Sequence, residues 1–133
     1  MKKKILILLV LTLALFTACG KKELSDTFDE DTVIEETKKA IDYFNSQDFE
    51  ALIDMGDENL KTAIDEAQFK EAYDQIIAEI GTFKELKGYE IQSAKKDGEE
   101  FVVVQYKAEH EAKEIDYIVT FNSNMELAGF LVK

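Results

Sequence analysis

Four aromatic residues have the properties needed to line a small-molecule site: Tyr73, Tyr106, Tyr117 and Phe130. Tyrosine hydroxyls in an apolar cleft can orient a ligand, or exchange a proton with it as general acids and bases. Packing in an ordinary core is the competing interpretation, because a buried tyrosine needs only one polar partner. The sequence leaves this choice open, although no acidic residue on the predicted inward strand faces supports catalysis there.

Other residues with metal-binding or catalytic side chains are few or poorly spaced. His110 is the only histidine, so it could at most act alone as a base, and its place at a predicted hairpin end favours a surface histidine. The acidic string between Asp26 and Glu36 lacks the alternation and the central glycine of an EF-hand loop. We therefore predict a solvated acidic face, no metal site, no cofactor and no catalytic residue.

Cys19 is the only cysteine, and its context suggests a modification. Three lysines at positions 2–4 precede an apolar run over residues 5–16, which is too short to cross a membrane and is typical of a secretory signal. The segment 15–19 resembles a bacterial lipobox, with Phe16 where leucine is usual. We expect cleavage before Cys19 and attachment of a diacylglycerol to its thiol, because two acyl chains give stable anchoring.

This processing divides the chain into a cleaved signal (1–18), a lipidated tether (19–30) and one domain (31–133). The mature chain would keep 13 lysines against 28 acidic residues, a net charge of −15. Such a charge repels nucleic acid, so nucleic acid is excluded as a partner. The predicted location is the cell membrane, where Cys19 anchors the domain on the extracytoplasmic face.

The first half of the domain has helical spacing. Predicted helices cover residues 32–45, 49–55, 60–64 and 65–80. Thr32 and Asp65 each begin a possible capping box, and we expect Gly56 to end the second helix in a left-handed conformation.

The second half alternates apolar and polar residues, with turn signals at 97–98, 111–112 and 123–124. Predicted strands cover residues 83–94, 100–110, 113–122 and 125–132. Helices followed by an antiparallel meander indicate the α+β class, with the helices on one face of a four-stranded sheet.

Strand phase assigns residues to the two faces of this sheet. Two-residue turns place Tyr106 opposite Tyr117 and Phe130 beside Tyr117, so this aromatic row points at the helices. The same register puts five apolar residues on the outer face: Phe101, Val103, Ile118, Leu127 and Leu131. An apolar outer face on so acidic a protein suggests a homodimer or partner surface.

A family resemblance agrees with this outline. It is carried by residues 43–50, by the region around Leu60, by Gly81-Thr82-Phe83 and by residues 127–130. These segments resemble domain of unknown function 3887, found in small Gram-positive lipoproteins, over residues 32–132. The resemblance implies a nuclear-transport-factor-2-like, or cystatin-like, fold in which a curved sheet wraps around helices and the mouth of the resulting cone can hold a small ligand.

The sequence therefore predicts a membrane-anchored lipoprotein domain that binds a small ligand or a protein partner without catalysis. Two alternatives stay open. One is a pocket enzyme of the dehydratase or isomerase type that uses tyrosine acid/base chemistry, and the other is a structural dimer or adaptor in an envelope complex.

Overall fold

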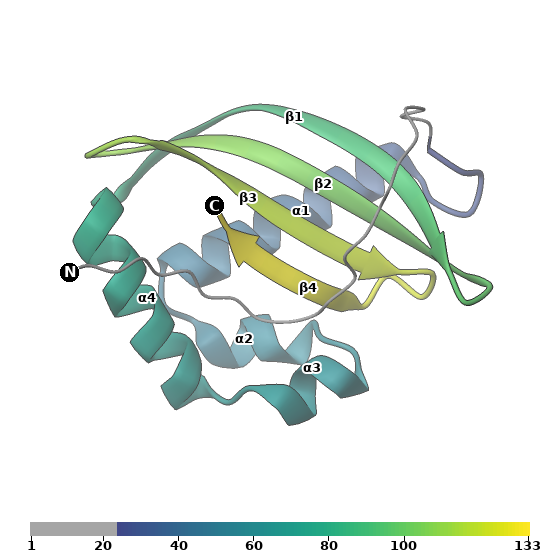
Figure 1. Ribbon diagram of the computed structural model, residues 1–133, viewed down its shortest axis with the longest axis horizontal. Coiled ribbons are helices and arrows are strands. Elements are labelled where there is room, and N and C mark those ends of the chain that lie inside the picture. Colours follow the sequence, from purple (N-terminus) through teal and green to yellow (C-terminus); the bar gives the residue numbers. More distant parts are fainter. Residues whose placement is uncertain (1–23) are drawn as a thin grey trace.

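The computed structural model describes residues 24–133, which form four helices followed by a four-stranded antiparallel sheet (Figure 1). The helices are α1 (Glu30–Asn45), α2 (Phe49–Asp54), α3 (Glu58–Ala63) and α4 (Glu66–Ile80), and the strands are β1 (Phe83–Lys96), β2 (Glu99–His110), β3 (Glu114–Asn122) and β4 (Leu127–Val132). The sheet has the order β1-β2-β3-β4 and curves over the helices. The predicted α+β class and meander are confirmed. The predicted signal and the lipidation site at Cys19 lie outside the described residues.

An aspartate caps the first turn of each of these helices. The carboxylates of Asp29, Asp48, Asp57 and Asp65 each accept a hydrogen bond from a backbone N–H three residues later. Such caps satisfy donors that have no partner within the helix. The predicted start of α1 at Thr32 is wrong, because Asp29 is the cap and the helix begins at Glu30.

The segment just before α1 belongs to the domain and not to a tether. Phe28 is 6% exposed and belongs to the core, and Leu24 packs against that core. The backbone N–H of Ser25 donates a hydrogen bond of 2.6 Å to Ser93 Oγ on β1. The prediction that residues 20–30 form a solvated tether is therefore wrong from residue 24 onward, because Leu24, Ser25 and Phe28 hold this segment against the domain.

Most of the predicted strand register is confirmed. Asp97 and Gly98 form the β1–β2 turn with positive φ values of 54° and 80°, as a two-residue hairpin turn requires. Tyr106 pairs with Tyr117 across β2 and β3, as predicted.

The β3–β4 connection differs from the prediction. The N–H of Asn122 donates to the carbonyl of Glu126, so the loop has three residues and not two. An irregularity then follows, so that Leu127 pairs with Phe121 while Phe130 pairs with Val119. Because the longer loop shifts the phase by one residue, the predicted outer-face position of Leu127 is wrong, and its side chain is fully buried.

Leu127 also links β4 to the helices. Its N–H donates to the carbonyl of Met55 at 2.7 Å, and its carbonyl accepts from the N–H of Asp57 at 2.9 Å. Gly56, between them, does not adopt the expected left-handed conformation, since it is not among the residues with positive φ. Glycine is needed there for space, because a Cβ would lie 2.6 Å from Cδ2 of Leu60.

Gly81 ends α4 as predicted, with φ of 83° and ψ of 177°, a region open essentially only to glycine. A Cβ there would also lie 2.7 Å from Glu111 Cβ and 3.1 Å from Ala112 N in the β2–β3 turn. This residue therefore fixes how closely the end of α4 approaches the sheet.

We expect Gly81→Ala to lower the free energy of unfolding by about 3 kcal/mol, because backbone strain of this kind alone costs about 1–3 kcal/mol and the clash adds to it. Gly98→Ala is the matched control, since Gly98 also has a positive φ but no atom within 4 Å of the added Cβ, and it should cost only about 1 kcal/mol. Urea denaturation followed by circular dichroism measures both losses. Equal losses would show that the contact with the β2–β3 turn is unimportant.

Candidate functional site

The four candidate pocket residues lie in the packed interior between sheet and helices. Tyr73, Tyr106, Tyr117 and Phe130 are 9%, 5%, 0% and 5% exposed. The ring of Phe44 on α1 lies 5.2 Å from that of Tyr73, 5.2 Å from that of Phe130 and 6.3 Å from that of Tyr117. These are typical aromatic packing distances. The structure thus brings three of the candidates together around Phe44, where they serve as core.

His110 also lies in this interior, so the prediction of a surface histidine is wrong. Its side chain is 2% exposed. Nδ1 lies 2.8 Å from the carbonyl oxygen of Gly81, and Nε2 lies 2.8 Å from the hydroxyl of Tyr117. The signal was present in the sequence, because His110 lies four residues after Tyr106 on the same strand and so shares its inward face.

The hydrogen-bond partners of His110 determine which of its ring nitrogens carries the proton. A carbonyl oxygen can only accept, so Nδ1–H donates to Gly81 and Nε2 of the neutral ring accepts from the Tyr117 hydroxyl. Asn45 Nδ2 in turn donates to the Tyr117 oxygen at 3.0 Å. Burial lowers the pKa of His110 and raises that of Tyr117. Both groups therefore stay neutral near pH 7, and this chain of hydrogen bonds joins α1, the end of α4 and two strands.

The remaining outer-face candidates do share one surface. Phe101, Val103, Ile118 and Leu131 are each partly exposed. Ile118 pairs directly with Leu131, and Val103 is its diagonal neighbour across β2 because Gln105 is its direct partner there. We call these four residues the outer apolar patch.

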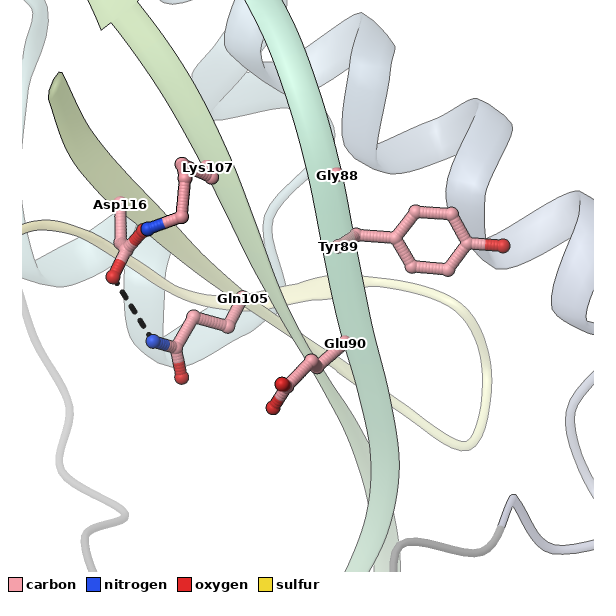
Figure 2. Close-up of a pocket in the computed structure, with 6 residues that line it drawn as sticks. All are labelled: Gly88, Tyr89, Glu90, Gln105, Lys107 and Asp116. Carbon is pink, nitrogen blue, oxygen red and sulfur yellow. Dashed lines mark hydrogen bonds and ion pairs between the residues drawn. The ribbon is translucent and has the colours of Figure 1, made fainter.

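Figure 2 shows a shallow hollow of about 270 Å³ on the sheet. It adjoins the outer apolar patch, because its lining residue Gln105 pairs with Ile118. It is lined by Gly88, Tyr89, Glu90, Gln105, Lys107 and Asp116. Gln105 Nε2 donates to one oxygen of Asp116 at 3.0 Å, and Lys107 Nζ lies 3.5 Å from the other. Figure 2 shows the Tyr89 ring pointing away from these polar side chains.

The hollow was not predicted from the sequence. The register of β1 against β2 shifts between Leu86 and Tyr89, and such an irregularity bends a strand locally. The sequence has no motif that indicates this hollow apart from Gly88, where an added Cβ would have no atom within 4 Å.

Charge is distributed unevenly over the domain. Residues 24–82, which include all four helices, contain 17 acidic residues and 4 lysines, whereas residues 83–133 contain 10 acidic residues and 7 lysines. The helical part thus has a net charge of −13 and the sheet a net charge of −3.

Within residues 24–133, no group of three or more His, Cys, Asp or Glu side chains could hold a metal ion. No helix in that range is long and apolar enough to cross a membrane.

Comparisons with known proteins agree with this fold. A family described as "Protein of unknown function (DUF3887)" matches residues 37–130, which confirms the resemblance predicted for residues 32–132. An NMR structure of a protein from Ruminococcus gnavus ATCC 29149 is similar, with a TM-score of 0.71 and 25% sequence identity. The match covers 84% of this chain and 98% of that one. No curated protein matches the chain.

The lowered pKa of His110 predicts a dependence of stability on pH. Because the unfolded chain binds this proton near pH 6.5 and the folded chain only at lower pH, the free energy of unfolding is highest above about pH 6.5 and decreases as the pH falls. The slope is at most about 1.4 kcal/mol per pH unit for one proton. His110→Gln should flatten the part of the curve between about pH 7.5 and about pH 5.5, where few carboxyl groups titrate.

Urea denaturation at several pH values measures this effect, with wild type and variant compared at each. An identical loss of stability in both proteins over this interval would contradict the assignment.

Proposed function

We propose that this chain, which belongs to the DUF3887 family of proteins of unknown function, is a lipid-anchored binding domain on the extracytoplasmic face of the cell membrane. The N-terminal pattern ending at Cys19 supports the anchor. The outer apolar patch is the observation that carries the binding role, because adjacent apolar side chains on an acidic surface favour burial against a partner.

In this proposal binding takes place on the outer face of the sheet and not inside the cone. Tyr73 and Tyr117 pack around Phe44, and Tyr117 also bonds to His110. Tyr106 packs against Tyr89. Acid/base chemistry by Tyr117 would require a substrate within hydrogen-bond reach of a hydroxyl, and this side chain is 0% exposed. Its packing therefore supports a binding role over the enzyme alternative.

The partner that we propose is a second copy of the chain. Two copies that approach through their helices would bring together two surfaces of strongly negative charge, whereas the sheet has charges of both signs. A two-fold contact places the same patch of each copy against the other. The Lys107–Asp116 ion pair lies beside the patch, so each copy can offer both a cation and an anion at the rim.

Self-association should depend on Leu131. We expect Leu131→Lys to convert a dimer into a monomer, because a buried ammonium group without a partner is strongly unfavourable at an apolar contact. Sedimentation equilibrium of the mature chain with Cys19→Ser measures the mass. The matched control is Ala112→Lys, which adds the same charge at an exposed position in the β2–β3 turn and should leave the dimer intact. A wild-type protein that stays monomeric would contradict this choice of partner.

Anchoring should depend on Cys19. We expect Cys19→Ala to abolish incorporation of labelled fatty acid and to release the protein from the membrane fraction or leave it unprocessed. Phe16→Leu, which restores the usual lipobox residue, should retain both labelling and membrane association. Persistent labelling of the Cys19→Ala protein would show that the acyl chains are attached elsewhere.

A further inference from the structure

We propose that the segment before α1 fixes the orientation of the domain on the membrane. One end of the sheet has the β1–β2 turn at Asp97 and Gly98, and we call it the hairpin end. The other has the β2–β3 turn at Glu111 and Ala112, and we call it the far end. In the proposed orientation the hairpin end faces the membrane and the far end points away from it. This inference rests on the lipid anchor of the proposed function and uses the proposed dimer as one supporting argument.

The N-terminal segment is attached to the hairpin end by specific contacts. Ser25 donates through its N–H to Ser93 Oγ at 2.6 Å and through its hydroxyl to Glu100 Oε1 at 3.1 Å. The hydroxyl of Thr27 donates to the same Glu100 oxygen. We call these hydrogen bonds, together with the buried ring of Phe28, the N-terminal clamp.

Glu100 is central to the clamp because it accepts from two hydroxyls. Those hydrogen bonds hold the pKa of its carboxyl group below the usual value, so the carboxylate is charged and a good acceptor near neutral pH. Ser93 and Glu100 lie on adjacent strands, three residues or fewer from the ends of the β1–β2 hairpin strands. The chain therefore enters the domain at the hairpin end, where Figure 1 also places the start of α1.

The clamp makes the remaining tether short. Five residue steps separate Cys19 from Leu24, and a fully extended chain of that length spans at most about 18 Å. The 12 residues of β2 that connect the two ends of the sheet measure about 40 Å when extended. An anchor at Cys19 thus confines the hairpin end to the neighbourhood of the bilayer and leaves the far end free to extend away from it.

Two features oppose an arrangement in which the domain lies flat on the membrane. The helical part has a net charge of −13, and the anionic headgroups of a bilayer repel it. The outer face of the sheet is covered by the second copy in the proposed dimer. An upright domain avoids both conflicts and presents its far end, with the loop that contacts Gly81, to the space outside the membrane.

Fluorescence energy transfer to the membrane tests this orientation. The lipidated protein is purified, reconstituted in vesicles of phosphatidylcholine and phosphatidylglycerol with an acceptor dye on the headgroups, and labelled with a donor dye at Lys96→Cys or Ala112→Cys. Cys19 is the only native cysteine and its thiol is acylated, so the introduced thiol takes the dye. We expect efficient transfer from position 96 and at least several-fold weaker transfer from position 112.

The clamp is tested by Glu100→Ala in both labelled proteins, since this change removes the acceptor of two hydrogen bonds. It should reduce the difference between the two positions, whereas the matched control Glu99→Ala, at the exposed neighbouring residue, should preserve it. An unchanged difference in Glu100→Ala would overturn the role of the two hydroxyl bonds to Glu100 in orienting the domain.

Two other results separate this inference from its premise. Equal transfer from both positions, in a protein whose mass includes the acyl chains, would overturn the orientation and leave the anchor intact. A mass without acyl chains would overturn the proposed anchor itself and the orientation with it.

Discussion

The arrangement of this domain depends on the contacts of the Phe44 ring. It touches aromatic rings from four other elements: Phe49 of α2, Phe69 and Tyr73 of α4, Tyr117 of β3 and Phe130 of β4. Aromatic pairs at these separations each contribute about 0.5–1.5 kcal/mol beyond the area they bury. Because one side chain on α1 is shared by so many partners, the helices and the sheet cannot pack independently of each other.

Because the interior is filled by side chains, we propose that binding takes place on the outer face of the sheet. Aromatic side chains fill the space beneath the sheet, and His110 connects the end of α4 to Tyr117. The helices bear most of the negative charge, which leaves the outer face of the sheet as the less charged and more apolar side. In the proposed dimer and orientation, the chain enters at one end of that sheet, and the outer face that contacts the second copy stands perpendicular to the membrane.

Local signals in the sequence predicted the elements well and the details at their junctions less well. The pairing of Tyr106 with Tyr117 followed from strict alternation and a two-residue turn. Leu127 was misplaced because a three-residue loop reversed the phase of one residue. His110 was misplaced because its position at a hairpin end suggested exposure, whereas its strand phase turns the side chain inward. Phe28 was missed because one apolar residue in an acidic segment gives too weak a pattern to indicate burial.

The pairing of Leu127 with the α2–α3 connection has a consequence for how the chain folds. Met55 and Leu127 are about 70 residues apart in sequence, so this contact can form only when nearly the whole polypeptide is available. Contacts between such distant segments raise contact order and slow the folding reaction. A newly made chain therefore cannot complete this contact until its last strand has been synthesised, a delay compatible with the export that the proposed lipid anchor requires.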